Sequence, residues 1–114
     1  MIVSNRPLDR DEQLESALER VAILEEDYEQ VLIKAAEAET EYRVRFAKAY
    51  LGADGTEKAR NSTAIIEVER FLEERNRTEA VKEFTREKLK DAQAAVSARQ
   101  SLLSASIRTN NAFA

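Results

Sequence analysis

Apolar residues recur in the first half of the chain with a period of seven. The seventh-residue members of this stripe are Leu14, Val21, Tyr28, Ala35, Tyr42 and Ala49, and they are flanked by Leu18, Leu24, Val31, Leu32, Ala38 and Phe46. Such a broad stripe is typical of an amphipathic helix. Pro7 fits only at or before the first turn of a helix, and Asp9 with Glu12 resembles a capping box. The pattern predicts a helix over about residues 8–51.

Both glycines of the chain, Gly52 and Gly55, lie directly after this stripe. Gly52 suits a helix C-cap, Asp54 and Gly55 suit a turn, and Thr56 suits the N-cap of a following helix. We therefore expect a turn over residues 52–56, with at least one glycine at positive φ.

The second half of the chain fits two descriptions. In a 3.6-residue frame the apolar face rotates after Val81, which would place a kink near residues 76–78 with Thr78 capping a further helix. In a 3.5-residue frame one seam persists, and a strict heptad indicates a left-handed supercoil. We favour one helix over about residues 57–108, followed by a mobile tail over 109–114. The seam consists of Ala64, Val68, Phe71, Arg75, Thr78, Lys82, Thr85, Leu89, Ala92, Val96, Arg99, Leu103 and Ser106.

The expected fold is therefore all-α, a single helical domain over residues 1–114 built as a long, coiled-coil-like antiparallel hairpin. Charge favours this arrangement, because residues 8–50 carry twelve acidic and six basic side chains, whereas residues 75–108 carry four acidic and eight basic ones. Folding back at the glycines would place Tyr28 near Thr78 and Val21 near Arg86. The acidic residues 25–29 would then face Arg75, Arg77 and Lys82.

Two helices do not cover all the apolar residues that the chain carries. A second seam follows the late helix, and the early helix is apolar on more than one side. Because large exposed apolar patches usually mark interfaces, we expect a homo-oligomer, such as a four-helix or larger bundle. The candidate oligomer interface comprises Ile23, Ile33, Val81, Phe84, Ala95 and Leu102.

The composition argues against an enzyme. The chain has no His and no Cys, which excludes thiolate chemistry, the usual zinc sites and His-dependent nucleophiles. Glu79, Glu83, Glu87 and Asp91 form a column beside Lys82, Arg86 and Lys90, which indicates a salt-bridged solvent face. No catalytic residue, metal ligand or cofactor site is expected. No apolar run would span a membrane and no signal peptide is evident, so a cytoplasmic location is expected.

A direct nucleic-acid interface is an alternative function for the basic second half. Its candidate contacts are Arg75, Arg77, Lys82, Arg86 and Lys90, which could track phosphates. Glutamates interrupt these basic rows and no aromatic platform is present on which bases could stack. Direct binding is therefore not the favoured interpretation.

Several short stretches give the chain a resemblance to a class of phage proteins. They are Glu39-Thr40-Glu41-Tyr42, Ala47-Lys48-Ala49-Tyr50-Leu51, Gly55-Thr56-Glu57-Lys58-Ala59-Arg60 and the segment Leu89–Arg108. The chain resembles small helical proteins from the early regions of tailed phages, whose genes often lie near strand-annealing recombinases or single-strand DNA-binding proteins. This resemblance implies a non-enzymatic, oligomerising accessory of DNA recombination or replication, with one of those proteins as partner, in the host cytoplasm. The alternative is a scaffold or chaperone of virion parts.

Overall fold

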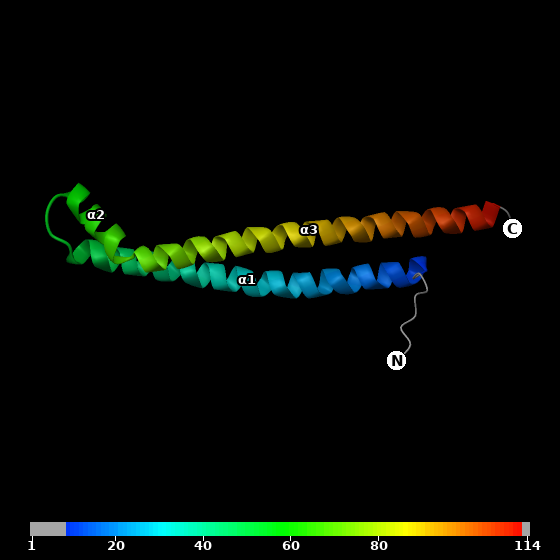
Figure 1. Cartoon of the computed structure of the whole chain (residues 1–114), viewed down its shortest axis with the longest axis horizontal. Helices are drawn as coiled ribbons and strands as arrows, with labels where there is room; N and C mark the ends of the chain where they lie inside the picture. The colour runs from blue at the N-terminus through cyan, green and yellow to red at the C-terminus, as the bar shows by residue number, and fades with distance from the viewer. Residues whose placement is uncertain (1–8, 113–114) are drawn as a thin grey trace, which may run out of the picture. The chain divides into compact units, whose positions relative to one another are not determined.

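The computed structural model describes residues 9–112, and these form three α-helices with no strand. Helix α1 spans Arg10–Gly52, α2 spans Glu57–Glu67 and α3 spans Glu69–Ala112 (Figure 1). The all-α class is therefore confirmed. The contacts divide the described residues into two compact units. Unit 1 holds the residues up to Glu26 and those from Glu87 onward, and unit 2 holds Asp27–Arg86.

The helix starts are set by side chains that accept hydrogen bonds from backbone N–H groups with no partner in the first turn. The carboxylate of Asp9 accepts a hydrogen bond of 2.8 Å from the N–H of Glu12 before α1. The hydroxyl of Thr56 accepts one of 3.2 Å from the N–H of Ala59 at the start of α2. Both caps confirm the predictions from the sequence.

In unit 1 the start of α1 lies beside the end of α3, and the two run in opposite directions (Figure 1, blue and orange to red). Two hydrogen bonds fix this pairing. Arg99 donates from Nη1 to the amide oxygen of Gln13 at 3.0 Å, and Arg10 donates from Nη1 to the carbonyl of Leu102 at 2.9 Å. Leu24 from α1 and Ala92 from α3 are buried in this unit.

In unit 2 the rest of α1 is held against α2 and the start of α3 by arginines. Arg60 of α2 donates from Nε and Nη2 to the carbonyl of Tyr50, both at 3.2 Å, and its guanidinium carbon lies 4.6 Å from the centre of the Tyr50 ring. A cation at the carbonyl end of α1 is also favourable for the helix dipole. Arg75 of α3 contacts Glu39 in an ion pair of 2.5 Å and lies over the Tyr42 ring.

The heptad seam predicted for the second half is confirmed. All of its members are buried or half-buried except Arg99, which is exposed. Its buried members are mostly small: Ala64, Thr78, Thr85 and Ala92, together with Val68. The two threonine hydroxyls donate to carbonyls of their own helix, Thr78 to Arg75 at 2.9 Å and Thr85 to Val81 at 2.8 Å. Buried polar atoms in the seam are therefore satisfied locally.

The favoured prediction of one continuous helix over about residues 57–108 is wrong, because this segment is interrupted. The interruption also lies at a different place from the alternative, a kink near residues 76–78. Residues 76–78 lie inside α3, whereas α2 ends at Glu67 and Val68 separates it from α3, with φ of −103° and ψ of 13°. Two features of the sequence fit this position. Ile65, Ile66 and Val68 are β-branched and lower helix propensity, and the Thr63 hydroxyl donates to the carbonyl of Ala59, a bond that often bends helices.

The pairing of α1 with α3 differs from the register expected from folding back at the glycines. That register would place Arg75 opposite a residue near Val31, whereas it pairs with Glu39, about one heptad further along α1. The expected ion pairs of Arg75, Arg77 and Lys82 with the acidic residues 25–29 were wrong, because their ion-pair partners are Glu39, Glu74 and Glu79. Lys82 nevertheless interacts electrostatically with Tyr28 of that segment. Since α2 and the bend at Val68 take up part of the chain, the antiparallel contact begins later than a tight hairpin would allow.

The end of α3 differs from the predicted tail. The helix continues past Arg108 to Ala112, and the hydroxyl of Thr109 donates to the carbonyl of Ala105 at 2.9 Å. The last part of the predicted tail, Phe113 and Ala114, lies outside the described residues.

The two glycines in the turn between α1 and α2 differ in whether they can be replaced by a residue with a side chain. Gly55 has φ of +103°, and an added Cβ would lie 3.3 Å from the Cβ of Ala59. We expect Gly55→Ala to lower the free energy of unfolding by about 1–2 kcal/mol. Gly52 is the matched control, because an added Cβ there meets no atom within 4 Å. Gly52→Ala should be neutral or slightly stabilising. Urea denaturation of both variants tests this, and equal effects would contradict the assigned turn.

Candidate interaction surface

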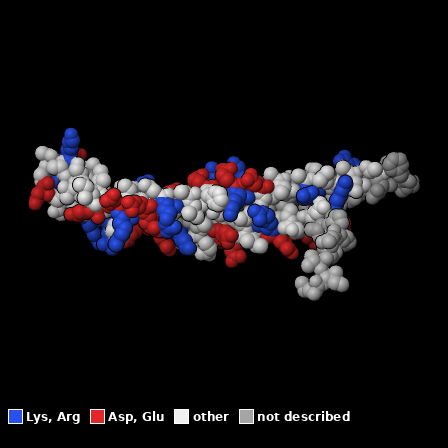
Figure 2. Space-filling view, viewed as in Figure 1, with Lys and Arg blue, Asp and Glu red and all other residues white. Residues whose placement is uncertain are grey.

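The five basic residues considered as nucleic-acid contacts all lie in ion pairs with acidic side chains. Four of these pairs are three residues apart on α3, and those of Lys82, Arg86 and Lys90 confirm the predicted salt-bridged face. The nitrogen–oxygen distances are 2.5 Å for Arg75–Glu39, 2.6 Å for Arg77–Glu74, 2.8 Å for Lys82–Glu79, 3.4 Å for Arg86–Glu83 and 3.8 Å for Lys90–Glu87. Lys and Arg atoms accordingly lie next to Asp and Glu atoms over the visible face of the described residues (Figure 2).

Three of these pairs shift the pKa of at least one member in the direction that favours its charged form. Hydrogen bonds from Arg43 and then from Arg75 lower the pKa of Glu39, and a hydrogen bond from Arg77 lowers the pKa of Glu74. The hydrogen bond to Glu79 raises the pKa of Lys82. These groups therefore stay charged at neutral pH, and their charges are largely compensated by their neighbours.

The residues of the candidate oligomer interface are all exposed. The exposed fraction is 62% for Ile23, 63% for Phe84 and 44% for Leu102, while Ile33, Val81 and Ala95 are also exposed. The two units share these positions: Ile23, Ala95 and Leu102 belong to unit 1, and Ile33, Val81 and Phe84 belong to unit 2. The predicted interface residues are therefore exposed in each unit, and one of them, Ala95, also lines a groove between α1 and α3.

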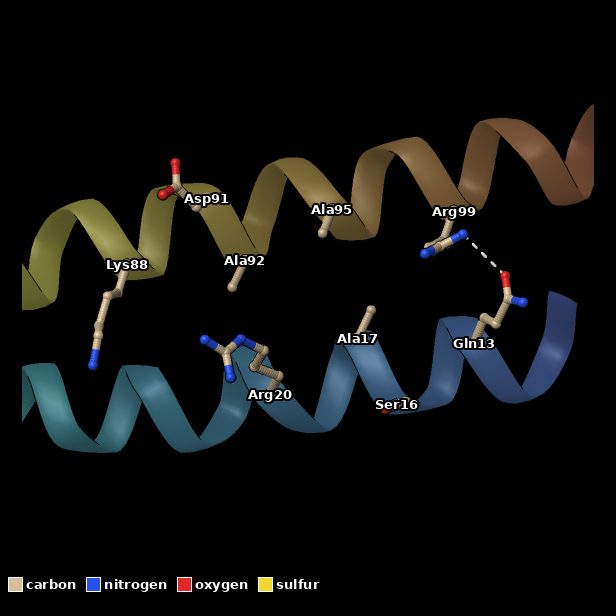
Figure 3. A pocket seen from close by; sticks show the side chains of 9 residues that line it. All are labelled: Gln13, Ser16, Ala17, Arg20, Lys88, Asp91, Ala92, Ala95 and Arg99. Carbon is tan, nitrogen blue, oxygen red and sulfur yellow. Dashed lines mark hydrogen bonds between the residues drawn. The ribbon is translucent and has the colours of Figure 1, made fainter. Parts of the chain in front are cut away.

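Unit 1 also contains a groove between its two helices, with a volume of about 390 Å³ (Figure 3). Four of its lining residues are small, namely Ser16 and Ala17 from α1 and Ala92 and Ala95 from α3. Four are charged, namely Arg20, Lys88, Asp91 and Arg99, and in Figure 3 the carboxylate of Asp91 points away from α1. In Figure 3 the methyl groups of Ala17, Ala92 and Ala95 point into the space between the ribbons, and the bond from Arg99 to Gln13 closes one end.

Most of the groove residues were not identified as functional candidates from the sequence. Ala95 was assigned to the second seam and Arg99 to the first, but neither assignment places them beside Arg20 and Ala17. Arg99 could have indicated the groove from the sequence, because it is a charged residue at a heptad seam position. Such a residue must either disrupt the contact or reach its edge, and here it reaches the edge and is exposed.

Among the described residues, no group of three or more acidic side chains is arranged to hold a metal ion. None of the described helices is long and apolar enough to cross a membrane. No known protein family, curated protein or solved structure is detectably similar to the chain.

Proposed function

We propose that the protein is a non-enzymatic, self-associating adaptor that acts through protein–protein contacts. The proposal rests on one observation: the described residues include few buried apolar side chains and many large exposed ones. The buried ones are Leu24, Ala35, Ala64, Val68 and Ala92. The large exposed ones are Leu18, Ile23, Leu32, Ile33, Val44, Leu51, Ile65, Ile66, Val81, Phe84, Leu102 and Ile107.

This imbalance favours association for energetic reasons. Burial of apolar surface stabilises by roughly 25 cal/mol per Å². Among the described residues, three of the five buried apolar side chains are alanines, which contribute little area. An isolated chain of this size has a marginal core, and association would remove much of the remaining apolar surface from water. The same contacts would then stabilise the fold and create the functional assembly.

The biological setting of the proposal rests on the resemblance to early phage proteins. In that setting the adaptor would act in the host cytoplasm and bind a strand-annealing recombinase or a single-strand DNA-binding protein. The compensated charges of the basic residues on α3 favour a protein partner over direct contact with DNA. Affinity capture from infected cells, followed by binding of the purified candidate, tests the choice of partner. Recovery of capsid or tail proteins alone would favour a virion scaffold.

Self-association is tested by sedimentation equilibrium of the full chain. We expect species heavier than the 12.9 kDa chain at micromolar concentration. Phe84→Glu should weaken the assembly about 10-fold or more, because it places a charge at an exposed apolar position of the proposed interface. Glu83→Lys is the matched control, since it alters a surface pair with Arg86 that contributes at most about 1 kcal/mol. A monomer that persists at high concentration would refute the proposal.

A further inference from the structure

The groove of unit 1 has an order of charges that is self-complementary. Along α3 the residues Asp91, Ala95 and Arg99 all line it, and the alanine lies midway between the acid and the base. A two-fold axis that passes beside Ala95 would reverse this order in a second copy. Asp91 would then lie opposite Arg99 of the second copy, and Arg99 opposite its Asp91. The two alanines would meet at the axis, as an isologous interface requires.

We infer that this groove is a dimer interface in which the α3 helices of two copies cross in antiparallel orientation at Ala95. The inference rests on the proposed self-association and specifies where and how it occurs. Ser16, Ala17, Ala92 and Ala95 leave the space of about 390 Å³ that the second helix would enter. Small residues at a crossing point let two helices approach closely, and the distance between helix axes depends on the side chains there.

The neighbouring surface of α3 continues the interface beyond the groove. Ala98, Leu102 and Ala105 follow Ala95 at spacings of three and four residues, and all of them are exposed. This spacing keeps them on one side of the helix. A helix that enters the groove at Ala95 would therefore cover Leu102, which is 44% exposed in the single chain.

The charges around the groove favour a second copy over an unrelated acidic helix. Arg20, Lys88 and Arg99 would attract such a helix, but Asp91 lies among them and would repel it. A second copy related by the two-fold axis would offer Arg99 to Asp91 and Asp91 to Arg99. The bond from Arg99 to Gln13 uses Nη1, and a guanidinium has further N–H donors that can bind a carboxylate.

A charge exchange in the full chain tests the geometry. Asp91→Arg alone and Arg99→Asp alone should each raise the dimer dissociation constant about 10-fold or more, because each places like charges opposite one another. The double variant should return to within about 3-fold of the parent protein, since the exchange recreates both pairs across the axis. Within one helix the two residues are about 12 Å apart along the axis, so rescue would report a contact between copies.

A second pair of variants tests the crossing point, and circular dichroism verifies that each variant folds. Ala95→Trp should abolish the dimer because it fills the groove, whereas the matched control Ala94→Trp, at the adjacent exposed position, should not. If the parent protein associates and none of these variants changes its dissociation constant, the interface lies elsewhere and the groove has another occupant, while the proposed function stands. If the double variant is no better than the singles, the antiparallel crossing is wrong. A monomeric parent protein would refute both proposals.

Discussion

Replacing Leu24 by alanine is expected to lower the free energy of unfolding by about 2–4 kcal/mol. Leu24 is 7% exposed and belongs to the small apolar core of unit 1, where the other buried side chain is Ala92. Among the described residues of unit 1, Leu24 is the one large apolar side chain that is buried, so its truncation would leave a cavity in the core. Because native proteins are only marginally stable, this loss could exceed half of the total.

Leu51→Ala is the control that separates burial from residue type. Leu51 lies on the same helix and is 76% exposed, so its removal should change stability by less than about 0.5 kcal/mol. Urea denaturation followed by circular dichroism measures both variants. Protein concentration must be the same throughout, because association contributes to apparent stability. If the two leucines prove equivalent, the seam assigned to α1 does not form the core.

The seam of α3 could be predicted because a heptad pattern reports which side of a helix is covered. Thr78, Lys82 and Thr85 are polar and would not be chosen as core residues one at a time. The 3.5-residue frame nevertheless places them between Val68 and Leu89, and the structure shows them buried or half-buried. Their small size or long aliphatic stems, together with local hydrogen bonds from the threonines, make this possible.

The register of the two helices could not be predicted from the same pattern. A repeat of seven looks the same after a shift of seven, so the seam is compatible with several pairings. Ion pairs between the two helices would distinguish these registers. Arg77 and Lys82, however, pair with Glu74 and Glu79 on their own helix, and such local pairs carry no information about the neighbouring helix. The groove of unit 1 depends on register and was missed for the same reason.

Weak binding of single-stranded DNA is the expected result for the unmodified protein, and removal of three glutamates should change it. Glu79, Glu83 and Glu87 pair with Lys82, Arg86 and Lys90. Phosphates would have to displace these carboxylates, so few counterions would be released and little affinity gained at physiological salt. Changing all three glutamates to glutamine should raise affinity roughly 10-fold or more at low salt. The salt dependence should steepen by about 0.7 for each additional phosphate neutralised.

Fluorescence anisotropy of a labelled oligonucleotide, titrated at several salt concentrations, measures both quantities. The control exchanges Glu15, Glu19 and Glu26 of α1 for glutamine, which changes the net charge equally but frees none of the candidate contacts. A similar gain in both variants would mean that net charge alone sets the affinity. Tight binding by the unmodified protein, lost steeply as salt rises, would overturn the adaptor proposal. Arg75, Arg77, Lys82, Arg86 and Lys90 would then be the residues to mutate. The unmodified protein is expected to bind DNA weakly by itself and to join it only when a recombinase or single-strand-binding protein is present. That result would mean that the functional contacts are between proteins, as the exposed apolar surface favours.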